Sequence, residues 1–197
     1  MARFRKTAIA AVALSALVAT SGAAYADHND HGVAASSAQG MKWAYYGGEL
    51  TDYTTAPNPL VDKPDIFKGA TASAMMIGME GRSIFRLTVS GIDAKKATYG
   101  VHLHQGTCNA DNPAEAGPHY NVTWDSTTKL SDVISSKTEV WLDLNVNSRG
   151  KAQSTATVSF IPDGQRSIVL HAAPTAKDGT AGARLACLPF DIKSYGG

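Results

Sequence analysis

Short runs of alternating apolar and polar residues, broken by glycine, proline, asparagine and aspartate, dominate this chain. Residues 83–89 (SIFRLTV) alternate cleanly from Phe85 onward, and Gly91 follows them. Alternation with a period of two places one apolar face on a β-sheet. No segment keeps the period of an amphipathic helix over three turns. The pattern predicts an all-β fold, a sandwich or barrel of about eight antiparallel strands.

Further extended runs follow the same rule. They are predicted over residues 42–46, 70–79, 99–105, 139–146, 154–161 and 167–171. The first is expected to end at Gly47 and Gly48, and turns over 147–150 (NSRG) and 162–164 (PDG) separate the last three. Frequent turns at this spacing favour antiparallel neighbours over parallel strands joined by helices.

The first 26 residues differ in composition from the rest. Three basic residues precede an apolar run over 8–19, and residues 24–26 (AYA) have the small-x-small pattern of a cleavage site. This is the organisation of a secretory signal peptide, and its apolar run is too short to span a bilayer. No later run is long enough to span one. We therefore predict a secreted protein cleaved after Ala26, with a flexible arm over 27–40 and one domain over 41–197.

Charge and cysteine content exclude further classes. The first 26 residues contain three of the 18 basic residues and none of the 17 acidic ones, so the remainder has net charge 15 − 17 = −2. A near-neutral exported chain has no electrostatic reason to bind nucleic acid. Its two cysteines, Cys108 and Cys187, are most simply one disulfide. In the chain-entropy model, a crosslink over so long a loop contributes about 4 kcal/mol.

Histidines are the candidate functional residues. Two of the six, His28 and His31, lie in the polar arm and are interpreted as solvated. The other four are divided among three motifs: His102 and His104 in HLH, His119 in GPHYN, and His171 at the end of IVLH. Alternate residues of a strand point the same way, so the HLH pair shares one face. Each motif alone also fits a structural or surface histidine.

Together the four imidazoles indicate a metal. With the cysteines expected in a disulfide, no thiolate is available, and four imidazoles suit Cu(II), although imidazole also suits zinc. The segments GVHLH (100–104), Cys108, GPHYN (117–121), IVLH (168–171) and GARLAC (182–187) resemble the copper/zinc superoxide dismutase family, in the family's order. The resemblance covers about 83–187 and implies a Greek-key β-barrel.

The resemblance also implies roles. His102, His104, His119 and His171 match the ligands of one copper per chain, and His119 matches the histidine that bridges copper to zinc. Arg184 matches the arginine that guides the superoxide anion. Cys108 and Cys187 match the intrasubunit disulfide. By this resemblance, Arg184 and His119 are the predicted catalytic residues.

Two departures favour the copper-only members of the family. Residues 121–149 contain no histidine, so the family's zinc site cannot form in the usual way. Only residues 172–183 separate His171 from Arg184, where the family has a longer electrostatic loop. We therefore expect copper without zinc.

Some other group must then orient His119, as carboxylates often do for metal-bound histidines. Glu139 shares a strand face with Trp141 and Asp143, and we hypothesise that it accepts a hydrogen bond from His119. The other carboxylates considered are Asp143, Asp132 and Asp125. The alternative is that Glu139 is an exposed surface carboxylate.

The sequence therefore predicts a secreted copper-dependent superoxide dismutase, which converts superoxide to O2 and H2O2. The alternative is a non-catalytic copper-binding or storage domain on the same scaffold. An arginine placed for an anionic substrate favours the enzyme, since copper storage has no use for it. Monomer and homodimer both remain open.

Overall fold

Antiparallel pairing organises the part of the chain that the computed structural model describes, residues 40–53, 66–93, 97–123 and 133–195. These residues belong to one unit, Ser37–Gly197. The strands are β1 (Lys42–Glu49), β2 (Thr51–Asp52), β3 (Thr71–Met79), β4 (Arg82–Ser90), β5 (Thr98–Tyr99), β6 (Val101–His104), β7 (Leu144–Asn145), β8 (Lys151–Val158), β9 (Gly164–His171) and β10 (Arg184–Ser194). The predicted signal peptide, His28, His31, Asp125 and Asp132 lie outside the described residues.

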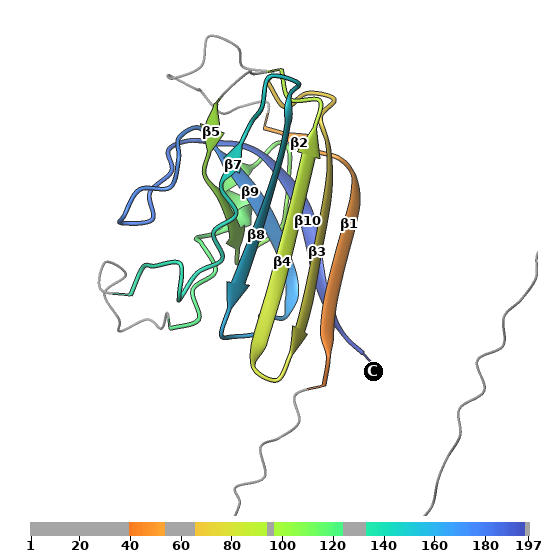
Figure 1. Ribbon diagram of the computed structural model, residues 1–197, viewed down its shortest axis with the longest axis vertical. Helices are drawn as coiled ribbons and strands as arrows, with labels where there is room; N and C mark the ends of the chain where they lie inside the picture. Colours follow the sequence, from red (N-terminus) through yellow and green to blue (C-terminus); the bar gives the residue numbers. More distant parts are fainter. Residues whose placement is uncertain (1–39, 54–65, 94–96, 124–132, 196–197) are drawn as a thin grey trace, which may run out of the picture. The chain divides into compact units, whose positions relative to one another are not determined.

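The strands form two layers with Greek-key connections. The strand order is β6-β9-β10-β1-β3-β4-β8, β2 pairs with β10, and β5 pairs with β7. Neighbours β4 and β8, like β6 and β9, are not consecutive in the chain, so the connections between them cross from one layer to the other. Figure 1 shows β1, β3, β4 and β8 side by side, with β9 and β10 behind them. The predicted all-β fold of the superoxide dismutase type is confirmed.

The core lies between these layers and follows the alternation in the sequence. In β3 and β4 every second residue is buried, including Met76, Phe85 and Leu87, which are 0% exposed. The rings of Phe85 and Phe190 lie 6.3 Å apart, between β4 and β10. Truncating such a buried phenylalanine to alanine costs about 3–5 kcal/mol, because a cavity remains.

Several strand predictions were wrong in extent, among them those over 42–46, 139–146, 154–161 and 167–171. The first strand continues through Gly47 and Gly48, which pair with Ser73 and Ala72 of β3. A Cβ on Gly47 would lie 2.6 Å from Oη of Tyr45, so glycine at this position leaves room for the tyrosine side chain. Of the run predicted over 139–146, only β7 is a strand, because the residues before it make single bridges to other segments. The sequence interpretation also missed β2 and β10.

Helical structure is minimal. The described residues contain one 3-10 turn, η1 (Pro113–Ala116), whose first turn is capped by the side chain of Asn112 accepting from the amide of Ala114. No helix among the described residues has the length and apolarity to cross a membrane.

Candidate metal centre

The four histidines of the body come together at one end of β6 and β9. β6 carries His102 and His104, and both are 0% exposed. β9 pairs with β6 and ends at His171, whose partner across the ladder is Arg184 at the start of β10. A single bridge between His104 and His119 brings in the last histidine. The predicted common direction of the HLH pair is therefore what the structure shows.

Two glycines make this approach possible. A Cβ on Gly100 would lie 2.6 Å from the Cβ of Ala181, so glycine lets the loop over 172–183 pack against β6. A Cβ on Gly106 would lie 2.0 Å from the carbonyl oxygen of Glu115, which is in η1. Larger residues at either position would push apart the segments that carry the histidines.

His104 and His171 present two lone pairs to each other. Nδ1 of His104 lies 2.9 Å from the carbonyl oxygen of Gly117, and Nδ1 of His171 lies 3.1 Å from that of Gly182. A carbonyl can only accept, so each Nδ1 carries the proton and each Nε2 carries a lone pair. The two Nε2 atoms lie 3.2 Å apart. Two lone pairs at this distance repel unless a cation lies between them.

The remaining two histidines complete the donor set. Nδ1 of His119 donates to Glu139, which leaves its Nε2 as a lone pair. In His102 the two ring nitrogens have exchanged roles. Its Nε2 is hydrogen-bonded to Thr175, and its buried Nδ1 has no hydrogen-bond partner among the described residues. The candidate ligand atoms of all four histidines lie within 4.8 Å of one another. Three Nε2 atoms and one Nδ1 atom thus fit a single metal ion.

Burial keeps the imidazoles of His102, His104 and His171 neutral. Desolvation lowers the pKa of His102 and His104 well below the usual range, and the neighbouring histidines lower it further. For His171, desolvation lowers the pKa to about 4, against the opposing hydrogen bond to Gly182. Neutral imidazole is the form that binds metals, so the folded protein holds its ligands ready.

Glu139 is buried beside His119 and is not an exposed carboxylate. Its Oε2 lies 3.1 Å from Nδ1 of His119 and 2.9 Å from Nε1 of Trp141, while Nδ2 of Asn121 donates to its Oε1 at 3.3 Å. Burial alone would raise the pKa of Glu139, but these three hydrogen bonds hold it below its ordinary value. The carboxylate is therefore ionised and fixed, although it is only 2% exposed.

Asp143 supports a different histidine. It was considered as an alternative to Glu139, but it contacts Thr175: the hydroxyl donates to Oδ1 at 2.5 Å and the amide to Oδ2 at 2.9 Å. Because the hydroxyl proton is used on Asp143, Oγ1 of Thr175 must accept from Nε2 of His102, at 2.8 Å. Sequence reasoning missed Thr175, which lies in a loop with no motif to mark it.

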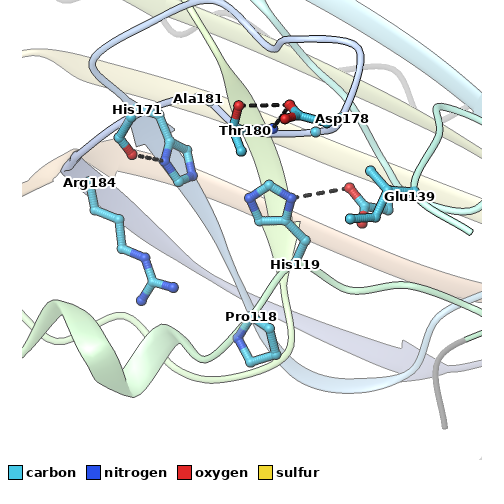
Figure 2. Close-up of a pocket in the computed structure, with 11 residues that line it drawn as sticks. Pro118, His119, Glu139, His171, Asp178, Thr180, Ala181 and Arg184 are labelled. Carbon is cyan, nitrogen blue, oxygen red and sulfur yellow. Dashed lines mark hydrogen bonds and ion pairs between the residues drawn. The ribbon is translucent and has the colours of Figure 1, made fainter. Parts of the chain in front are cut away.

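Arg184 faces a pocket of about 510 Å³ that also exposes His119, His171 and Glu139. Figure 2 shows His119 between His171 and Glu139, with Arg184 on the side of Pro118. The guanidinium donates to the carbonyl oxygens of Pro113 and Gly117, each at 2.5 Å. It is thus held at the mouth of the site, where it provides a fixed positive charge.

The disulfide between Cys108 and Cys187 is present, with Cα atoms 5.6 Å apart. It ties the segment after β6 to β10. Cys187 packs with Tyr53, Ala116 and Val169 in a small buried cluster. The crosslink therefore fixes the strand that begins at Arg184 against the segment leading to His119.

A family model described as copper/zinc superoxide dismutase (SODC) matches residues 75–188, more than half of the chain. The chain belongs to the copper/zinc superoxide dismutase family. The matched span includes the four clustered histidines, both cysteines, Glu139 and Arg184. A comparison with curated proteins found no match.

Membership of the superoxide dismutase family agrees with the donor set. Imidazole nitrogens without thiolate or carboxylate in the inner set suit copper. The metal-binding cluster predicted from the sequence is thus supported both by the family and by the convergence of four histidine side chains.

Proposed function

We propose that this protein is a secreted copper-dependent superoxide dismutase that works without zinc. Copper binding is supported above all by one observation: the Nε2 atoms of His104 and His171 lie 3.2 Å apart in a buried site, and each carries a lone pair. Together with Nε2 of His119 and Nδ1 of His102 they would hold one copper ion. When bound, copper would supply the alternation of Cu(II) and Cu(I) by which two superoxide anions and two protons become O2 and H2O2.

The proposal that the enzyme works without zinc rests on the hydrogen-bond partner of Nδ1 of His119. In the family this histidine bridges the two metals, so its second nitrogen would face zinc. Here that nitrogen donates to Glu139. Among the described residues, the four histidines are the one group of three or more His, Cys, Asp or Glu side chains that converge. A carboxylate on Nδ1 fixes the ring as a metal would, while keeping a proton on it.

The other side chains have roles that their contacts support. Arg184 would attract the superoxide anion and orient it by hydrogen bonds at the pocket. Asp143, through Thr175, would keep the proton of His102 on Nε2 and its lone pair on Nδ1. The loop over 172–183 is short and closed on itself by backbone hydrogen bonds from Ala172 to Ala183 and from Ala173 to Ala181, so it leaves the pocket open.

The deciding experiment is the dismutation rate of the exported protein, loaded with copper and kept free of zinc. A second-order rate constant of roughly 10^8 to 10^9 per molar per second would support the proposal. Adding zinc should leave the rate unchanged. Copper bound stoichiometrically without dismutation would mean a non-catalytic copper-binding or storage domain, and a requirement for zinc would refute the copper-only assignment.

A further inference from the structure

The hydrogen bond between His119 and Glu139 lies at an open pocket, yet its carboxylate is almost completely covered. Both residues line the pocket. The side chain of His119 is 20% exposed, whereas that of Glu139 is 3% exposed. Water that reached Oε2 of Glu139 would compete with Nδ1 of His119 for the same oxygen. The residues that keep water from this oxygen therefore help to hold the ring of His119.

Gly179 and Ile134 meet beside that oxygen. A Cβ on Gly179 would lie 3.7 Å from Oε2 of Glu139 and only 2.4 Å from Cγ2 of Ile134. The Cγ2 methyl of Ile134 therefore takes the place that a side chain at position 179 would fill. Gly179 also has a φ of 79°, in the left-handed region that favours glycine. Glycine thus lets the backbone of the loop over 172–183 approach Ile134 closely, next to the carboxylate.

The turn that carries Gly179 is fixed by its own hydrogen bonds. The amide of Gly179 donates to the carbonyl oxygen of Ala176 at 3.0 Å, and the amide of Ala176 donates to that of Thr180 at 2.8 Å. The side chain of Asp178 accepts from both the amide and the hydroxyl of Thr180. Figure 2 shows Asp178 and Thr180 on the wall of the pocket that also contains His119. This side of the contact is therefore held in place without help from Ile134.

The segment that carries Ile134 is held by the same residues that surround Glu139. The carbonyl oxygen of Val133 accepts from Nδ2 of Asn121 at 3.3 Å and from the hydroxyl of Thr138. Nδ2 of Asn121 also donates to Oε1 of Glu139 at 3.3 Å. Asn121 therefore joins the carboxylate to the residue that precedes Ile134, which keeps the isoleucine next to the carboxylate.

We infer that Ile134 is a positioning residue for His119. Its side chain and the backbone of Gly179 form an apolar cover that excludes water from Oε2 of Glu139. The inference rests on the proposed function, in which Glu139 holds His119 where the family has zinc. A charge-assisted hydrogen bond is stronger in a dry environment than in water, so the ring keeps both its plane and its Nδ1 proton. The pocket remains open on the side of Arg184, where an anion would enter.

The test is the exchange of the Nδ1 proton of His119 with solvent. It is followed by NMR of the exported protein in its metal-free and Cu(I)-loaded forms, both of which are diamagnetic. Ile134→Ala should accelerate this exchange by about tenfold or more, because water then reaches the acceptor. The Nδ1 protons of His104 and His171 bond to backbone carbonyls and are references within the same molecule. Their exchange should change by less than about threefold.

The matched control is Ile161→Ala. Cγ2 of Ile161 also lies against a glycine, 2.6 Å from the place of a Cβ on Gly78, but Ile161 does not line the pocket. This variant should leave the exchange of the His119 proton unchanged. Ile134→Val keeps the Cγ2 methyl and should retain slow exchange.

A second substitution tests the geometry of the cover. When Ile134→Ala is combined with Gly179→Ala, the new methyl group at 179 lies 3.8 Å from the Cβ at 134 and 3.7 Å from Oε2 of Glu139, which are ordinary contacts. The double variant should therefore recover slow exchange, although alanine at a positive φ makes it less stable than Ile134→Ala. Should Ile134→Ala not fold, Gly179→Ala alone takes its place, because its Cβ displaces Cγ2 of Ile134.

Unchanged exchange of the His119 proton in Ile134→Ala would overturn the inference, and so would equal acceleration of all three histidine protons. A double variant that exchanges as fast as Ile134→Ala would also contradict it. The readout does not require dismutation. A wild-type protein that binds copper but does not dismutate would refute the proposed function, whereas the exchange rates would still decide the role of Ile134.

Discussion

Nδ1 of His119 lies 3.1 Å from Oε2 of Glu139, and the same oxygen accepts a hydrogen bond from Nε1 of Trp141. Three donors around one buried carboxylate leave it no freedom to turn. The contact therefore fixes both the ring plane of His119 and the nitrogen that carries its proton. Among the described residues, no other hydrogen bond joins a histidine that lines the pocket to a buried carboxylate.

Glu139→Gln should separate charge from shape at this position. The amide keeps the size of the side chain but removes the negative charge that stabilises a proton on Nδ1 of His119. We expect copper to remain bound, the dismutation rate to fall about tenfold, and the decline at high pH to begin at lower pH. The measurement is the rate across the pH range, with Glu80→Gln in the β3–β4 turn as control. An unchanged rate and pH profile would end this assignment of Glu139.

Thr175→Val should lower copper affinity. Valine is nearly isosteric, but it cannot accept the proton of Nε2 of His102 or connect that ring to Asp143. Loss of a contact that orients a metal-binding histidine typically costs 10- to 100-fold in affinity, and we expect a loss in this range. Competition with a copper chelator measures it. Thr88→Val, at an exposed site on β4, is the matched control, and equal affinities in both variants would show that Thr175 does not orient His102.

Contacts that follow from the period of a strand can be predicted from the sequence, whereas contacts that depend on the path of a loop cannot. The alternation in β3 and β4 predicts their faces because a strand has one period and one buried side. The face of His102 on β6 follows from the same rule, with the order of the motifs supplied by the family. Thr175 could not be predicted, because its position depends on how the loop over 172–183 folds back onto Gly100. The continuation of β1 through Gly47 and Gly48 was not predicted, because two consecutive glycines indicate a turn. Pairing with β3 keeps both glycines in the strand.

Arg184→Ala should slow turnover and leave copper content unchanged. The guanidinium lies at the pocket but is not among the candidate ligands, so its loss removes the attraction for an anion without removing a donor. We expect the rate to fall at least tenfold and to become less sensitive to salt, because steering by a fixed charge is screened by ions. Arg184→Lys should recover part of the rate. Loss of copper from Arg184→Ala would instead mean that its bond to Gly117, which His104 shares, is structural.

Acid should destabilise the metal-free protein, and the sign follows from the buried histidines. His171 has a pKa of about 4 in the fold against an ordinary value of 6.5, so between these values the unfolded chain binds a proton that the folded chain does not. Stability is therefore complete above about pH 6.5 and decreases as the pH falls towards 4. His171 alone should cost about 2 kcal/mol at pH 5, and His102 and His104 add to the loss in the same direction. Glu139, whose pKa is lowered, loses its stabilising contribution only as the pH falls below its ordinary value of 4.5, outside the range between pH 7.5 and pH 5. Urea unfolding of the metal-free, disulfide-bonded protein at pH 7.5 and pH 5 measures the difference, and His171→Gln should reduce it. Equal free energies of unfolding at the two pH values would show that these imidazoles are not held neutral by burial.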